Sequence, residues 1–168
     1  MTGLVVTRTG AALALVTLSF FALRGTLNLL NAVAVPLILY TALYPLLGRH
    51  IVLAGGGFLL WTLLFFRVQL VFALVYLGLF TALVISRHWA LLPRGALLWV
   101  LAFTGFLTAI YATQWLWGIP LVSITRALAG GTQAGLVGLI GLQSLLPAVV
   151  LPLLAEFFDR RLQHLSRT

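Results

Sequence analysis

Long apolar stretches without a charged residue, separated by arginines, restrict what this chain can fold into. Six stretches follow one another: Gly10–Leu23, Gly25–Gly48, Ile51–Phe66, Val68–Ser86, Gly95–Thr125 and Ala127–Ala155. A helix that crosses a bilayer needs about 20 predominantly apolar residues. Only helices and closed β-barrels can span a membrane, and these stretches lack the alternation of apolar and polar residues that a barrel strand shows. The sequence therefore predicts an all-α membrane protein.

The composition supports a single domain that lies within the membrane. Of 168 residues, 62% are hydrophobic and 7% are charged, whereas soluble domains have about 25% charged residues. This length accommodates six helices with short loops and no separate soluble domain. We expect one compact helical bundle over residues 1–168, with transmembrane helices near 8–23, 27–47, 50–66, 69–87, 95–117 and 133–158.

Glycine and proline predict where the long apolar stretches are interrupted. Gly118-Ile119-Pro120 is expected to end the fifth helix, and residues 119–132 to form an outer segment with a short surface helix that carries Arg126. Residues 87–94 are expected to form the longest connection on the opposite side. Prolines within the second and sixth helices favour kinks; they are Pro36, Pro45, Pro147 and Pro152.

The distribution of arginines predicts the topology. If each apolar stretch crosses the membrane once, the side with both termini carries seven arginines: Arg8, Arg49, Arg87, Arg94, Arg160, Arg161 and Arg167. The other side carries three: Arg24, Arg67 and Arg126. Because cytoplasmic loops are enriched in basic residues, we expect both termini in the cytoplasm.

The net charge of +8 comes from arginines distributed over several loops. They form no continuous basic stripe, so the sequence does not favour nucleic-acid binding. They would lie at the level of lipid headgroups, where contact with anionic lipid explains them. The chain has no cysteine, which excludes disulfides and thiolate ligands for a metal.

Few residues could perform chemistry. The only acids, Glu156 and Asp159, lie three positions apart at the cytoplasmic end of the last helix, where pairing with the neighbouring arginines is expected. The histidines, His50, His88 and His164, lie at predicted cytoplasmic boundaries and lack metal-binding spacing. We therefore expect no catalytic residue, no metal site and no cofactor.

Glycines recur on one side of the sixth helix in the patterns Gly131-x-x-x-Gly135 and Gly138-x-x-Gly141. Small residues allow helix backbones to approach closely in lipid. We expect this side to pack against another helix, either within this chain or in a second protein.

Polar residues also gather near the predicted outer side. They could form a small-ligand pocket, or they could contact headgroups within an aromatic belt. The candidate outer cluster consists of Arg24, Asn28, Asn31, Arg67, Gln69, Gln114, Trp115 and Arg126.

Two segments resemble MreD, a membrane subunit of the bacterial cell-elongation machinery. PLILYTALYPLLGR (Pro36–Arg49) is similar to that family's apolar helix before a short basic turn. LLPAVVLPLLAEFFDRRLQHL (Leu145–Leu165) is similar to its last helix and basic tail. The next helix of the family ends in an acid, whereas AGGGFLLWTLLFF (Ala54–Phe66) has none, so no functional residue is carried over. The resemblance implies a non-enzymatic subunit in peptidoglycan synthesis, with a single-span partner similar to MreC.

The predicted architecture also resembles the substrate-binding S component of energy-coupling-factor vitamin transporters. S components dock through small residues spaced four apart, and the first helix has Ala11 and Ala14 but no clean Ala-x-x-x-Ala spacing. We therefore expect a multi-pass subunit of the bacterial plasma (inner) membrane that binds another membrane protein. A vitamin-binding S component remains the alternative.

Overall fold

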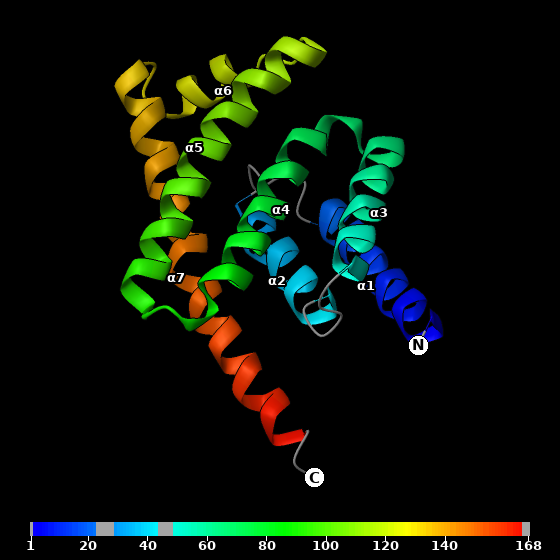
Figure 1. The fold of residues 1–168 in the computed structure, drawn as a ribbon. Helices are drawn as coiled ribbons and strands as arrows, with labels where there is room; N and C mark the ends of the chain where they lie inside the picture. Colours follow the sequence, from blue (N-terminus) through cyan, green and yellow to red (C-terminus); the bar gives the residue numbers. More distant parts are fainter. Residues whose placement is uncertain (1, 23–28, 44–48, 166–168) are drawn as a thin grey trace.

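A computed structural model describes residues 2–22, 29–43 and 49–165, and Figure 1 shows their arrangement. These residues form helices and no strand. The elements are α1 (Thr2–Ala22), α2 (Asn31–Leu43), α3 (Arg49–Phe65), the 3₁₀ turn η2 (Arg67–Gln69), α4 (Leu70–Ile85), the 3₁₀ turn η3 (Ser86–His88), α5 (Leu91–Trp117), α6 (Leu121–Leu128) and α7 (Gln133–Leu165). The predicted all-α class is confirmed.

Three helices among the described residues are long and apolar enough to cross a membrane. They are Arg67–His88, Leu91–Trp117 and Gln133–Arg160. The other apolar helices are shorter within the described residues, at Val6–Ala22, Asn31–Leu43 and Ile51–Phe65. All six correspond in position to the apolar stretches of the sequence.

Helix α4 joins the two halves of the bundle. In Figure 1 it lies between α5, α6 and α7 on one side and α1, α2 and α3 on the other. It packs against α2, α3 and α5, and α5 packs against α7 along much of its length. The core is centred on large side chains that are almost fully buried, including Leu39, Tyr76, Leu79, Leu83 and Leu98.

Glycine and proline end these helices as the sequence predicts. Gly118, with φ of 67°, caps α5 by donating its N–H to the carbonyl of Gln114 at 2.9 Å. This left-handed conformation suits glycine because it has no Cβ. The short helix α6 follows, carries Arg126 and packs on α5 and α7. The predicted surface helix is confirmed.

The expected length of the connection after α4 was wrong. Residues 87–94 do not form one long loop, because α5 begins at Leu91. Pro93 lies in the first turn of this helix, where a missing N–H breaks no intrahelical hydrogen bond. The connection is therefore only η3 and the two residues after it, and Arg94 belongs to the helix.

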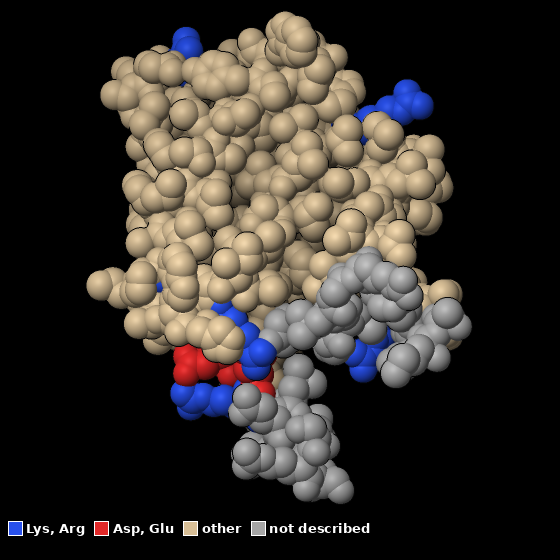
Figure 2. Space-filling model, viewed as in Figure 1, with Lys and Arg blue, Asp and Glu red and all other residues tan. Residues whose placement is uncertain are grey.

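Charged side chains occupy the two ends of the molecule and leave a neutral belt between them. Figure 2 shows basic groups at both ends of one face, whereas acidic groups appear at the lower end alone. The beginning of α1 and the end of α7 both lie toward this lower end (Figure 1). We call it the acidic end. A neutral belt of this kind suits a protein that lies in a bilayer.

Candidate functional site

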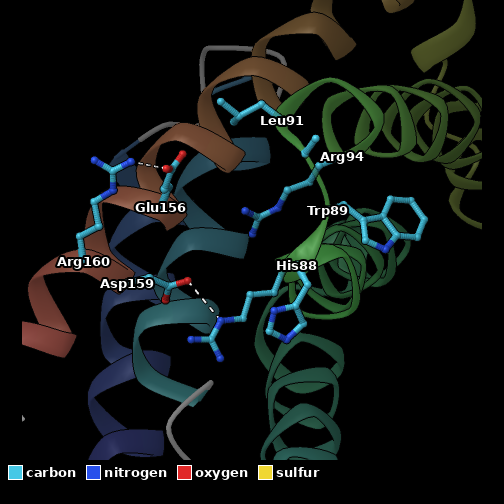
Figure 3. Close-up of a pocket in the computed structure, with 9 residues that line it drawn as sticks. His88, Trp89, Leu91, Arg94, Glu156, Asp159 and Arg160 are labelled. Carbon is cyan, nitrogen blue, oxygen red and sulfur yellow. Dashed lines mark hydrogen bonds and ion pairs between the residues drawn. The ribbon is translucent and has the colours of Figure 1, made fainter.

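A polar pocket of about 580 Å³ lies at the acidic end, between η3, the start of α5 and the last part of α7. Figure 3 shows charged side chains from these three elements turned toward the same space. Its lining consists of Arg87, His88, Trp89, Ala90, Leu91, Arg94, Glu156, Asp159 and Arg160.

Both acids in this pocket have basic partners. Glu156 accepts a hydrogen bond from Arg160, one turn later on α7. Asp159 lies 3.5 Å from the Nε of Arg87, which belongs to η3. The predicted pairing with neighbouring arginines is confirmed for Glu156, whereas Asp159 pairs with an arginine from a distant part of the sequence.

Asp159 also accepts a hydrogen bond from the hydroxyl of Tyr40, whose oxygen lies 2.9 and 3.0 Å from its two carboxylate oxygens. Tyr40 is itself almost fully buried in α2. One carboxylate thus connects α2, η3 and α7. The side chain of Asp159 is only 15% exposed, so it lies largely within the packing of these elements.

Arg94 is the most deeply buried charged residue of this pocket, at 4% exposure. Its Nη2 donates to the carbonyl oxygen of Leu83 at 3.1 Å, near the end of α4. Its Nε has no hydrogen-bond partner among the described residues. A buried donor without a partner is costly, and a buried charge is costlier.

These contacts indicate what the pocket can do. The carboxylates are held in pairs, and the described residues contain no cluster of three or more histidines or acids that could hold a metal ion. Among the described residues, Arg94 forms no ion pair with either acid. The arrangement therefore suits binding of an anionic group better than proton transfer.

The structure separates the candidate outer cluster into several groups. Arg24 and Asn28 lie outside the described residues. Asn31 is buried at the start of α2, where its Oδ1 accepts a hydrogen bond from Ser19 at 2.6 Å. Trp115 is 84% exposed near the end of α5. The cluster therefore includes both buried contacts between helices and exposed groups.

Arg67 and Gln69 line a second pocket of about 320 Å³, together with Phe20, Phe65, Phe66 and Val68. The Oε1 of Gln69 is buried and has no partner among the described residues. This aromatic pocket lies at η2, which joins α3 to α4 at the end of the bundle opposite to the acidic end (Figure 1).

Gln114 and Arg126 instead organise the region around α6. The Oε1 of Gln114 accepts a hydrogen bond from the N–H of Val122 at 3.1 Å. Arg126 donates to the Oε1 of Gln133, and the Nε2 of Gln133 donates to the hydroxyl of Tyr111, both at 2.8 Å. These bonds link α5, α6 and α7.

The four candidate glycines have different surroundings. Gly131 lies in the turn before α7 with φ of 77°, so it is outside the helix. A Cβ on Gly135 would lie 1.9 Å from the carbonyl oxygen of Ala129, whereas a Cβ on Gly141 would have an ordinary contact of 3.7 Å with Phe103. Gly138 is exposed and has no atom within 4 Å of its Cβ position.

Sequence reasoning missed Tyr40 and the burial of Arg94. A tyrosine in an apolar helix does not reveal which distant carboxylate it will meet. For Arg94 there was one signal, because Pro93 is well tolerated in the first turn of a helix. An earlier start of α5 would have placed Arg94 on a helix rather than in a loop.

In comparisons with known proteins, no family model, no curated protein and no solved structure matched this chain. Its function is therefore argued from the arrangement of its own residues.

Proposed function

We propose that this chain is a non-catalytic, multi-pass subunit of the bacterial plasma membrane that works by binding another membrane protein. Six apolar helices would cross the bilayer, with both termini and the acidic end in the cytoplasm. The distribution of arginines supports this orientation, because seven lie on the side of the termini and three on the other.

The observation that carries the proposal is the exposed small surface of α7. Ala134 and Gly138 lie four residues apart, so they share one side of the helix, and both are exposed. Outside the adjacent turns of α7, no atom of the described residues lies within 4 Å of the Cβ position of Gly138. Small residues at this spacing allow a second helix to approach closely in lipid. A single transmembrane helix of a partner, as in MreC, fits this surface.

The acidic end supports the absence of a catalytic role. Tyr40, Arg87 and Asp159 hold three elements together, and Glu156 is paired with Arg160. These contacts are structural. A role in the cell-elongation machinery follows the resemblance to MreD, in which such a subunit positions partners rather than catalysing a reaction.

Co-purification of the tagged chain from its native membrane tests the proposal. Gly138→Leu should remove a single-span partner without lowering the thermal stability of the purified chain. Gly78→Leu is the matched control, because Gly78 is an exposed glycine of α4 with no atom within 4 Å of its Cβ position. Retention of all partners by Gly138→Leu would contradict the proposed interface.

The aromatic pocket at η2 favours the alternative function, an S component that binds a vitamin. Its 320 Å³ lies near the lower limit for small-ligand sites, about 300–1,000 Å³. Phe65 and Phe66 supply apolar walls, and Arg67 and the unpartnered oxygen of Gln69 supply polar contacts. Mass spectrometry of the purified protein separates the two functions, because an S component should retain a vitamin or its precursor through detergent purification.

A further inference from the structure

We propose that the polar pocket at the acidic end and an adjoining apolar groove form a binding site for one anionic phospholipid. The phosphate would lie beside Arg94, and an acyl chain would follow the groove between α5 and α7. This proposal requires that the helices lie in a bilayer. It does not depend on a protein partner or on a vitamin.

Arg94 provides the first argument. The side chain is 4% exposed, and its Nε has no partner among the described residues. Figure 3 shows its guanidinium pointing into the space between η3 and the acids of α7. Because arginine stays charged in proteins, this buried cation needs a counter-charge. Leu83, its one hydrogen-bond acceptor among the described residues, does not supply it.

The start of α5 provides a second group of donors. A helix N-terminus carries a partial positive charge and free N–H groups that attract anions. No side chain caps α5, and its first residue, Leu91, lines the pocket. The N–H groups of Leu91 and Leu92 belong to this uncapped first turn. Pro93, the next residue of the turn, has no N–H. Arg94 and this helix end thus favour a negative charge at the same place.

The two acids do not cancel this preference. Asp159 is held by Tyr40 and Arg87, and Glu156 is held by Arg160. Each acid therefore has a cation of its own, and the charge of Arg94 remains in excess. A phosphate, with several acceptor oxygens, matches the donors of an arginine and of a helix N-terminus.

The groove explains why a lipid fits better than a free anion. It has a volume of about 500 Å³ and shares Leu91 with the polar pocket. The other residues that line it are Leu92, Gly95, Ala96, Trp99, Leu145, Ala148, Val149, Pro152 and Leu153. From Leu145 to Leu153 the helix rises about 12 Å, enough for part of an acyl chain.

The lining therefore changes from apolar to charged along the same two helices. On α7, Leu153 lines the groove and Glu156 lines the pocket. Trp89, which is 50% exposed, lies at the rim, and tryptophan is enriched at the boundary between acyl chains and headgroups. An amphiphile with an anionic headgroup matches this order.

Lipid titration of the delipidated protein in a neutral detergent tests the site. The probes are dioleoyl phosphatidylglycerol, zwitterionic dioleoyl phosphatidylcholine and inorganic phosphate, with thermal unfolding and native mass spectrometry as measurements. Phosphatidylglycerol should bind and raise the unfolding temperature, whereas phosphatidylcholine and phosphate should do neither.

Two variants address the two halves of the site. Arg94→Gln removes the charge, and Ala96→Trp fills the groove from an exposed position; each should weaken phosphatidylglycerol binding about tenfold or more. Their matched controls are Arg67→Gln, an exposed arginine at the opposite end, and Ala14→Trp, an exposed alanine of α1. Both controls should bind as the wild type does.

Three results would overturn the proposal. Unchanged binding in Arg94→Gln would show that the buried arginine does not hold the headgroup. If Arg67→Gln lost as much phosphatidylglycerol binding as Arg94→Gln, the lipid would be attracted to basic residues in general. If inorganic phosphate raised the unfolding temperature as much as phosphatidylglycerol does, and Ala96→Trp did not change that rise, the site would be one for a free anion. If Arg94→Gln does not fold, Ala96→Trp is compared with Ala14→Trp instead. Loss of phosphatidylglycerol binding in Ala96→Trp alone would support the lipid site. Equal binding by the two variants would overturn it.

Discussion

The hydroxyl of Tyr40 lies within 3.0 Å of both carboxylate oxygens of Asp159, although 119 positions separate these residues in the sequence. This contact adds a polar link to the direct packing of α7 against α2. Because Asp159 also pairs with Arg87 of η3, one carboxylate joins three elements at the acidic end.

Replacement of this tyrosine should loosen the acidic end. In Tyr40→Phe the hydrogen bond to a charged, partly buried acceptor is lost, and we expect the free energy of unfolding to fall by about 1–2 kcal/mol. Thermal unfolding of the purified protein in detergent measures the effect. Tyr111→Phe is the control, because the Tyr111 hydroxyl accepts its hydrogen bond from Gln133 at an exposed site and the loss of this bond should have a smaller effect.

A double-mutant cycle with Tyr40→Phe and Asp159→Ala tests whether the two residues act together. If they do, the second substitution should have less effect in the background of the first, with a coupling energy of about 1 kcal/mol. Additive effects would mean that the contact does not contribute to stability.

Gly135 should be much less tolerant of a side chain than Gly138. A Cβ at Gly135 would collide with the carbonyl oxygen of Ala129, a backbone atom that can move only if the turn before α7 moves. We expect Gly135→Ala to lower the free energy of unfolding by about 1–3 kcal/mol. Gly138→Ala should be neutral or stabilising, because the Cβ position of Gly138 is open and alanine is more favourable than glycine in a helix by about 1 kcal/mol. Equal stabilities for both variants would contradict the observed packing of the turn.

Apart from the start of α5, the sequence was sufficient to place the helices, because their positions follow from local properties. Apolar stretches, arginines at the boundaries and the Gly118-Ile119-Pro120 break each act within a few residues. The contacts of Asp159 and Arg94 were not predictable in this way. They depend on how α2, α4 and α7 meet across long sequence separations, and apolar helices with no marked polar side do not specify which faces will touch.

The same limitation applies to the candidate sites. Glycine spacing indicated a small side of α7, but only the packing shows that Gly135 faces its own turn while Gly138 is open. The outer polar residues were grouped because they share one predicted side of the membrane. The structure distributes the described ones among α2, η2, α5 and α6, because helices that end on one side need not be neighbours.

Cysteine labelling should report both termini in the cytoplasm. The native chain has no cysteine, so a single introduced cysteine gives an unambiguous signal. In intact cells, a cysteine at Thr2 or Thr168 should not react with an impermeant thiol reagent, and one at the exposed Ser123 of α6 should react. If a cysteine at either terminus reacted with the reagent before the cells were permeabilised, the prediction of six transmembrane helices with both termini in the cytoplasm would be wrong.

Alanine substitutions of the outer arginines should not affect vitamin uptake if the chain is a partner-binding subunit. The structure gives Arg126 another role, because it donates to Gln133, which donates to Tyr111, and so it helps to hold α6 on α5 and α7. Arg67 is exposed at the edge of the aromatic pocket. Loss of an arginine that clamps an anionic ligand should cost about 2–5 kcal/mol of binding, whereas loss of a headgroup contact should cost far less.

Uptake is best measured in cells that lack their own importer for the vitamin supplied, with Arg24→Ala, Arg67→Ala and Arg126→Ala compared at equal membrane levels. We expect no difference from the wild type for any of the three. Gln69→Ala provides a second probe of the aromatic pocket, since it removes the buried oxygen that has no partner there. A collapse of uptake in both Arg67→Ala and Gln69→Ala, with Arg126→Ala unaffected, would identify that pocket as a ligand site and favour the S-component function over the one proposed here.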